Sequence, residues 1–205
     1  MALRPLSRTV SSLTGIVVLV AALWFLLNFV WAPSCGRFAC SYTPSWWPQA
    51  EADSGDSCPE NIAAAAGDAT WAAGRYATIK DAKITTGLFY DADGSEHRIE
   101  SGRDADSERV LAVLYEIGVV QPPVRPNVVD HVETKVAALM RAEGLTSGVL
   151  VINFPRGVCG TEAPQPYSCA AIVPAILPDG ATLAVWSPRE IDEGRPSVKL
   201  TGDAR

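Results

Sequence analysis

The pattern that most constrains the fold of this sequence is a histidine and a glutamate two residues apart, followed by two cysteines. His131 and Glu133 open a segment with apolar residues at helical spacing, and Cys159 and Cys169 come after a continuous apolar run. One imidazole and two thiolates can bind zinc tetrahedrally and leave the fourth position to water. A glutamate that is not itself a ligand can move protons to and from that water. We therefore expect the fold to bring His131, Cys159 and Cys169 together, with Glu133 beside them.

The spacing of the two cysteines allows a competing interpretation. Zinc deaminases usually carry these ligands as Pro-Cys-x-x-Cys, whereas here residues 160–168 separate Cys159 from Cys169. A disulfide between the two would suit an oxidising, extracytoplasmic compartment. If Cys169 instead follows Ser168 at the start of a helix, its thiol should have a depressed pKa, which favours the thiolate that zinc requires.

The histidine and glutamate also have a structural alternative. Asp130 and Glu133 stand three residues apart before an apolar stripe, which is the spacing of an N-cap and its capping box. His131 would then be only a polar residue of the first turn. Residues two apart on a helix point about 200° apart, so His131 and Glu133 can face one point only at the N-terminal end of the helix. The sequence places them there.

A long apolar run near the N-terminus predicts a membrane segment. Residues 13–32 carry no charge, and about 20 apolar residues in a helix match the hydrocarbon thickness of a bilayer. Arg4 and Arg8 precede the run and only Arg37 follows closely, so residues 1–12 are expected in the cytoplasm and the rest outside it. No good cleavage site follows, which favours a single-pass anchor over a secreted, processed chain. A buried soluble helix is the alternative.

Residues 33–70 are rich in Ser, Pro, Asp, Gly and Ala and are expected to form a linker. The linker contains three cysteines, Cys35, Cys40 and Cys58. Two of them could form a disulfide, in any of three pairings, and the third would remain a free thiol. The whole chain has a formal charge of -6 and a pI near 4.9. This balance argues against binding nucleic acid by bulk neutralisation of phosphates, so any such binding must rest on a pocket.

Residues 71–205 are expected to form one α/β layered domain. The turn sequence 91–95 joins two short strand-like runs into a hairpin, and the apolar run 149–152 is typical of a central strand buried on both faces. The expected elements are strands 85–90 and 97–101, a helix over 107–117, a helix from Asp130 to a C-terminal Gly144, a strand over 148–154, a helix from Cys169 that ends by Pro178, and strands 181–186 and 197–201.

Several of these segments together resemble one family. These segments are residues 131–141, Gly144-Leu145, residues 150–153, the two spaced cysteines and residues 177–183. Their combination resembles the bacterial DddA-like, SCP-type deaminase toxins. The turn 86–94 and Ser101-Gly102 fit the opening hairpin of that family. The resemblance covers about residues 76–201, and family members vary in the distance between their cysteines.

The resemblance implies a cytidine-deaminase-like fold, a mixed sheet with helices, that converts cytosine in DNA to uracil. It implies zinc held by His131, Cys159 and Cys169, Glu133 as the proton shuttle, and an immunity protein as a partner. This sequence departs from the family at Phe154, where a second asparagine is common, and in lacking a compact Cys-x-x-Cys. Since these positions border the pocket, the substrate is less constrained than the metal chemistry.

Three residues near the end of the predicted central strand are candidates for binding the substrate: Asn153, Phe154 and Arg156. Phe154 could stack on a base, and Arg156 could attract a phosphate. Taking a cytosine out of a duplex costs a few kcal/mol, so single-stranded DNA is the expected substrate. The alternatives are a free nucleoside deaminase and a membrane-anchored binding module stabilised by zinc or a disulfide, which would have no use for Glu133.

Overall fold

The computed structural model describes residues 61–203 of the chain. The predicted cytoplasmic N-terminus 1–12, the membrane segment 13–32, and Cys35, Cys40 and Cys58 of the linker lie outside the described residues. Within residues 61–203, no helix has both the length and the apolar character needed to cross a bilayer.

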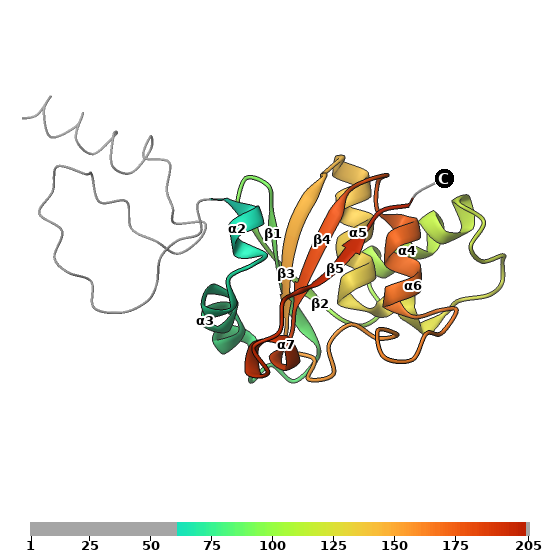
Figure 1. Ribbon diagram of the computed structural model, residues 1–205. Helices are drawn as coiled ribbons and strands as arrows, with labels where there is room; N and C mark the ends of the chain where they lie inside the picture. The colour runs from blue at the N-terminus through green and yellow to red at the C-terminus, as the bar shows by residue number, and fades with distance from the viewer. Residues whose placement is uncertain (1–60, 204–205) are drawn as a thin grey trace, which may run out of the picture. The chain divides into compact units, whose positions relative to one another are not determined.

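A five-stranded mixed sheet forms the centre of the described domain (Figure 1). Its strands lie in the order β2-β1-β3-β4-β5. The parallel pair is β3 with β4, and the other neighbouring pairs are antiparallel. The strands are β1 (Thr86–Asp91), β2 (Glu96–Glu100), β3 (Ser147–Ile152), β4 (Thr182–Trp186) and β5 (Val198–Thr201). The expectation of an α/β domain with a mixed sheet is confirmed.

Helices cover both faces of the sheet (Figure 1). One face carries α4 (Ala105–Glu116), α5 (Val132–Glu143) and α6 (Cys169–Ile176). The other carries α2 (Ile62–Ala65) and α3 (Ala69–Ile79), with α7 (Pro188–Asp192) packed against α3. A short 3-10 helix, η2 (Asn127–Asp130), leads directly into α5. The layered arrangement places the first turns of α5 and α6 at the same end of the sheet as the start of β1 and the ends of β3 and β4.

The hairpin and the central strand follow from local sequence, as predicted. The carboxylate of Asp91 accepts hydrogen bonds from the main-chain N–H groups of Asp93 and Ser95, and this closes the turn between β1 and β2. The residues of β3 from Val149 onward are at most 1% exposed. A strand with neighbours on both sides and helices on both faces needs apolar residues in succession, and this explains the uninterrupted run.

The sequence analysis placed the start of the domain at Trp71. The first helix that the structure describes, α2, lies before that residue. Ile62 and Ala65 of α2 are buried, and the indole N–H of Trp186 donates to the carbonyl oxygen of Ala65 at 3.2 Å. The Ser197 hydroxyl donates to the carbonyl oxygen of Ala66 at 2.7 Å. The alanine-rich segment offers no amphipathic pattern, so its helix is revealed by its contacts with β3, with β4 and with the residue before β5.

Candidate metal centre and active site

The main chain of His131 is held on both sides. His131 is the N-cap residue of α5, with an extended backbone. Its N–H donates to the carbonyl oxygen of Val128 at 3.1 Å, and its own carbonyl oxygen accepts from the N–H of Lys135 at 3.2 Å and the hydroxyl of Thr134 at 2.9 Å. These bonds fix the direction in which the imidazole leaves the helix.

The sequence analysis predicted Asp130 as the N-cap of the helix. This prediction is wrong, because α5 starts one residue later and its N-cap is His131. Asp130 ends η2, and its carboxylate accepts from the Arg125 guanidinium at 2.6 Å instead of capping α5. Helix α5 has no side-chain cap. Glu133 therefore closes no capping box with Asp130, and its side chain is 4% exposed and lines the cavity beside His131.

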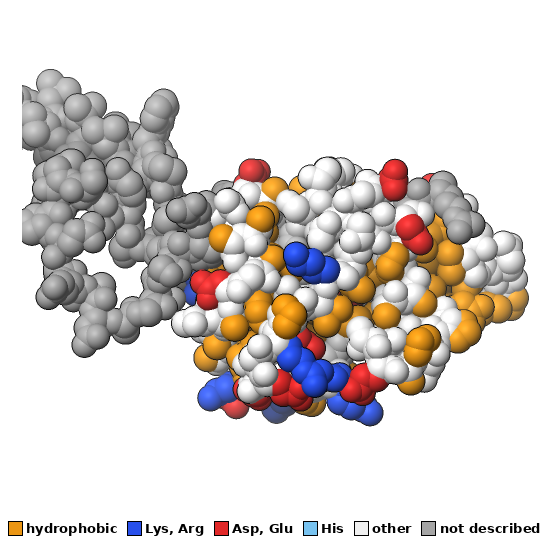
Figure 2. Space-filling model, in the orientation of Figure 1, with side chains coloured by type: hydrophobic (Ala, Val, Ile, Leu, Met, Phe, Trp, Pro, Cys, Tyr) orange, Lys and Arg blue, Asp and Glu red, His pale blue; other side chains and the backbone are white. Residues whose placement is uncertain are grey.

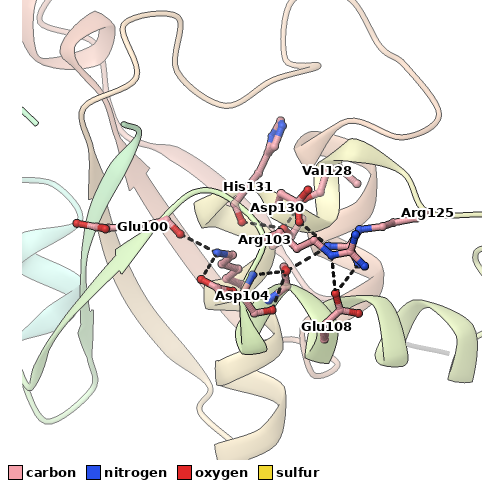
Figure 3. Close-up of polar contacts among 11 residues, drawn as sticks. Glu100, Arg103, Asp104, Glu108, Arg125, Val128, Asp130 and His131 are labelled. Carbon is pink, nitrogen blue, oxygen red and sulfur yellow. Dashed lines mark hydrogen bonds and ion pairs between the residues drawn. The ribbon is translucent and has the colours of Figure 1, made fainter. Parts of the chain in front are cut away.

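A polar network lies behind the first turn of α5 (Figure 3). The ammonium of Lys135 is fully buried and donates to the carbonyl oxygen of Glu100 at 2.7 Å and to the carboxylate of Asp104 at 2.6 Å. Figure 3 shows the ring of His131 pointing away from this network. The network therefore joins the end of β2 and the start of α4 to α5 and leaves the imidazole free on the opposite side.

The two cysteines meet the imidazole despite their separation in sequence. The Nδ1 atom of His131 lies 3.3 Å from Cys169 Sγ and 3.7 Å from Cys159 Sγ, and the three ligand atoms are within 4.8 Å of one another. The main-chain N–H of Ala170 donates to the carbonyl oxygen of Cys159 at 3.0 Å, while the segment between the cysteines loops outward. Both cysteines are free thiols, so the disulfide alternative is not what the structure contains.

The thiol pKa values reverse one prediction from the sequence. A hydrogen bond from the Cys169 thiol is the largest effect on Cys159 and, with the bond to His131, lowers its pKa to about 4 in spite of partial burial. The same bond and the complete burial of Cys169 raise the pKa of the Cys169 thiol. The depressed pKa was expected at Cys169. It belongs to Cys159, chiefly because that sulfur accepts the bond from the Cys169 thiol, and the main-chain N–H at the start of α6, which also points to it, adds a smaller effect.

Two other titratable groups of the site have shifted pKa values. The hydrogen bond with Cys159 raises the pKa of His131, and burial opposes this. Burial raises the pKa of the Glu133 carboxyl, while a bond from its own main-chain N–H and the charge of His131 act in the opposite direction. A buried carboxyl with a raised pKa exchanges a proton more readily near neutral pH than an exposed one, which suits a general acid and base.

A cavity of about 530 Å³ opens in front of these groups. Its walls include Thr85 and Ser101 from the open end of the hairpin, and Glu162 and Gln165 from the loop between the cysteines. The sequence analysis did not predict that these four residues line a cavity. The hairpin itself was predicted, and the pairing of Ser101 N–H with the Thr85 carbonyl at 2.8 Å closes it. No local pattern shows that this end of the hairpin faces α5.

The three candidate substrate-binding residues separate into two groups. Phe154 and Arg156 line the cavity, and the guanidinium of Arg156 lies 5.4 Å from the centre of the Phe154 ring. Asn153 is not among the lining residues. Its amide oxygen accepts from the N–H of Thr86 at 2.8 Å, and its amide nitrogen donates to the carbonyl oxygens of Ile79 and Ile84 at 3.1 and 3.2 Å.

The side chains of His131, Cys159 and Cys169 fit a metal ion. One nitrogen and two sulfur donors converge, one of the thiols is readily ionised, and the site opens to a cavity on one side. Sites with three protein ligands of this type are typical of catalytic zinc, whereas structural zinc sites are closed by four.

A comparison with protein-family models agrees with this geometry. The model of the SCP1.201-like deaminases matches residues 59–203. The chain belongs to the SCP1.201-like deaminase family. No curated protein matches it. The expected deaminase family and a His/Cys/Cys group able to hold a metal are thereby confirmed, and the matched segment includes α2, which the sequence analysis assigned to the linker.

Proposed function

We propose that this chain is a zinc-dependent, DddA-like cytosine deaminase that acts on single-stranded DNA. The observation that supports this most directly is the convergence of His131 Nδ1 with the sulfur atoms of Cys159 and Cys169 beside an open cavity that His131, Glu133 and Cys159 line. The family match supports deamination in general.

In this proposal His131, Cys159 and Cys169 hold the zinc. Bound zinc would supply a Lewis acid that makes water nucleophilic at neutral pH. Glu133 would carry two protons in turn, since its carboxyl is buried beside the same cavity: it takes one from water to the ring nitrogen N3, and then takes the proton of the attacking hydroxyl to the amino group, which leaves as ammonia. The main-chain bonds of His131 keep the imidazole in place while Glu133 changes protonation.

The preference for a single strand rests on charge and on the cavity wall. The chain carries a net charge of -6, so broad attraction of a duplex is weak at physiological salt. Phe154 offers a ring on which a base can stack, and Arg156 lies over that ring at the mouth. Stacking of a base on an aromatic side chain contributes about 1 to 3 kcal/mol in single-strand binders, whereas removal of a base from a duplex costs a few kcal/mol.

The test uses the full-length chain, purified in mild detergent under reducing conditions and loaded with zinc. A short oligodeoxynucleotide with one cytosine, free or annealed to its complement, is assayed for uracil together with free cytidine. We expect the free strand to react fastest, and Glu133→Gln to lower the rate about 10²- to 10⁴-fold while zinc content and fold are kept.

The other outcomes separate the competing functions. Equal or faster conversion of the duplex would contradict the single-strand preference, and conversion of cytidine alone would identify a nucleoside deaminase. Bound zinc with no conversion of any cytosine substrate would favour a zinc-stabilised binding module.

The cellular setting is also part of the proposal and rests on the sequence. The apolar residues 13–32 would anchor the chain in a membrane with the deaminase domain outside the cytoplasm, where it would act as a toxin against other cells and be blocked by an immunity protein in the producer. A reporter that works only in the cytoplasm, fused after Arg205, should be silent. A bright cytoplasmic signal would contradict this topology.

A further inference from the structure

A second hollow adjoins the active-site cavity. Its volume is also about 530 Å³, and it lies between the loop that follows β3 and the helix α7 with its following turn. Arg156 and Glu162 line both this hollow and the active-site cavity, so the two share a rim. We call it the α7 groove and define it by its charged residues Arg156, Glu162, Arg189, Asp192, Glu193 and Arg195. Figure 2 shows charged side chains of both signs gathered along the edge of the molecule where Figure 1 places α7.

The arginines of the α7 groove differ in their partners. Arg189 lies 2.7 Å from the carboxylate of Glu162, and Arg195 lies 2.7 Å from that of Glu193. Within residues 61–203, Arg156 forms no ion pair, and its guanidinium instead lies over the ring of Phe154. Three guanidinium groups and three carboxylates thus line the groove, and Arg156, directly on the rim of the active-site cavity, is the guanidinium that forms no ion pair with a carboxylate of the described domain.

The pair of Arg189 and Glu162 is asymmetric. The side chain of Arg189 is 20% exposed, whereas that of Glu162 is 73% exposed. The guanidinium of Arg189 is thus mostly buried, whereas the carboxylate of Glu162 can rotate into solvent. The loss of this ion pair costs little free energy, because an ion pair with an exposed partner contributes only about 0 to 1 kcal/mol to stability. A guanidinium presents parallel N–H donors that match the oxygens of a phosphate. Glu162 occupies the position that such an anion would take.

We propose that the α7 groove binds a phosphodiester of the nucleic-acid strand next to the target base, through Arg189 and Arg156. The inference rests on the proposed function, because a strand whose cytosine enters the active-site cavity has to leave it across a rim. Arg156 and Glu162 form the part of that rim that continues into a second hollow. The strand displaces Glu162 from Arg189, and the carboxylate moves into solvent.

A purely structural role for the same pair predicts the opposite result. Glu162 belongs to the loop between the two cysteine ligands, and its bond to Arg189 joins this loop to α7. If the bond served only to hold the cavity wall, loss of Glu162 would loosen the wall and weaken binding of the strand. If Glu162 competes with a phosphate, loss of its charge tightens binding.

The experiment measures binding of a short single-stranded oligodeoxynucleotide with one cytosine to the full-length, zinc-loaded chain over a range of salt concentrations. We expect Glu162→Gln to tighten binding up to about fivefold. Arg189→Gln should weaken it about tenfold or more, and should lower the slope of log K against log salt by about 0.7, because one phosphate is no longer neutralised. Arg156→Gln should weaken binding in the same direction, and this exposed side chain forms no ion pair with residues 61–203 that the substitution would break.

An oligonucleotide of the same sequence with neutral methylphosphonate linkages on both sides of the cytosine is the matched control. With this probe, Arg189→Gln and the unsubstituted chain should bind equally. Weaker binding by Glu162→Gln, or unchanged binding by both arginine variants, would overturn the proposal. Binding is measured without turnover, so the two proposals can fail separately. If the chain deaminates the oligonucleotide but these variants do not change binding, the proposal for the α7 groove is wrong and the proposed function stands. If the variants change binding as expected but no deamination occurs, the proposed enzyme activity is wrong and the groove still binds the strand.

Discussion

The main-chain N–H of Cys169 lies 3.0 Å from the sulfur of Cys159. This bond places the positive end of α6 against the sulfur of a residue outside the helix, and it adds to the bond from the Cys169 thiol, which is the largest cause of the lowered pKa of the Cys159 thiol. Helix α6 therefore does two things at once, since it carries one buried sulfur ligand and stabilises the thiolate of the other. The long segment between the cysteines does not disturb this contact and is free to form a wall of the cavity.

Substitution of any of the three convergent residues should remove the metal. We expect the full-length chain to bind about one zinc ion, and His131→Ala, Cys159→Ala or Cys169→Ala to reduce the bound zinc to near zero, because two remaining donors do not hold it. Elemental analysis of the purified chain measures this. Tyr167→Phe, in the exposed loop between the cysteines, should keep its zinc. Full zinc content in a Cys159→Ala variant would contradict the ligand set.

Asn153 should matter for stability more than for substrate. Asn153→Ala leaves the N–H of Thr86 without its partner. The carbonyl oxygens of Ile79 and Ile84 each lose one bond but still accept from the Ala82 N–H and the Thr86 hydroxyl. An unpaired N–H costs about 1 to 3 kcal/mol where water cannot replace the bond, so urea denaturation should show a loss of that order.

The neighbouring residue supplies the control for this prediction. Phe154→Leu alters the cavity wall and should raise KM with a much smaller change in stability, because Phe154 is only partly buried. If Asn153→Ala instead left stability unchanged and raised KM, Asn153 would be a substrate-binding residue as the sequence analysis predicted.

Gly157 should be sensitive to substitution by alanine. Its φ is +67°, and an added Cβ would meet the Ser187 hydroxyl at 3.0 Å and the Glu190 carboxylate at 3.4 Å. We expect Gly157→Ala to cost about 1 to 3 kcal/mol in thermal or urea denaturation and to displace the loop that leads to Cys159. Gly180→Ala is matched in backbone conformation, with φ of +70° and open space around its Cβ, and should cost less. An equal cost for both variants would show that only the backbone conformation matters.

The ion pair of Lys135 and Asp104 predicts a dependence of stability on pH. Burial tends to raise the pKa of Asp104, but bonds from Lys135 and from main-chain N–H groups lower it overall. The pKa of Asp104 in the folded state is thus below the unfolded value of about 3.9. The ionised carboxylate therefore adds to the free energy of unfolding above about pH 3.9, and this addition is lost as the pH falls through the lowered pKa. Asp104→Asn retains an N-cap oxygen and should lose about 1 kcal/mol at pH 7, since Asp104 is about half exposed.

Unfolding free energies measured from neutral to acid pH test this assignment. The difference between the unsubstituted chain and Asp104→Asn should shrink as the pH falls below about 3.9. Asp106→Asn removes a surface pair with Arg109 and serves as the control, with a change of at most about 0.5 kcal/mol. A difference for Asp104→Asn that stays constant into acid would contradict the role of its charge.

Residues 59–70 should be needed by the domain. A fragment from Trp71 onward lacks the buried side chain of Ile62 and the carbonyl oxygen of Ala65 that accepts from the Trp186 indole. Relative to a fragment from Pro59, it should unfold with a free energy lower by at least about 3 kcal/mol, from one buried aliphatic side chain and one unpaired buried N–H. Ile62→Ala in the longer fragment should give part of this loss. Equal stability of the two fragments would support the boundary near Trp71.

Local sequence alone determined much of the site. The hairpin, the buried strand β3 and the helix that starts at His131 depend on turn residues and on the spacing of apolar side chains, and these signals act over a few residues. The same spacing placed His131 and Glu133 in the first turn of α5, where both can face one cavity. The two cysteines were candidate ligands from their residue type, the resemblance to a family accounted for their wide spacing, and the structure brings their sulfur atoms to the imidazole of His131.

The tertiary structure decided what depends on residues far apart in the sequence. It decided that the main-chain N–H of Cys169 stabilises Cys159, that Asn153 is bound by the segment before β1, and that Thr85 and Ser101 face the cavity. No local pattern specifies such contacts, because each arises only when the sheet register and the packing of α5 and α6 against the sheet are in place. The same packing turned the segment between the cysteines into a wall shared by two hollows.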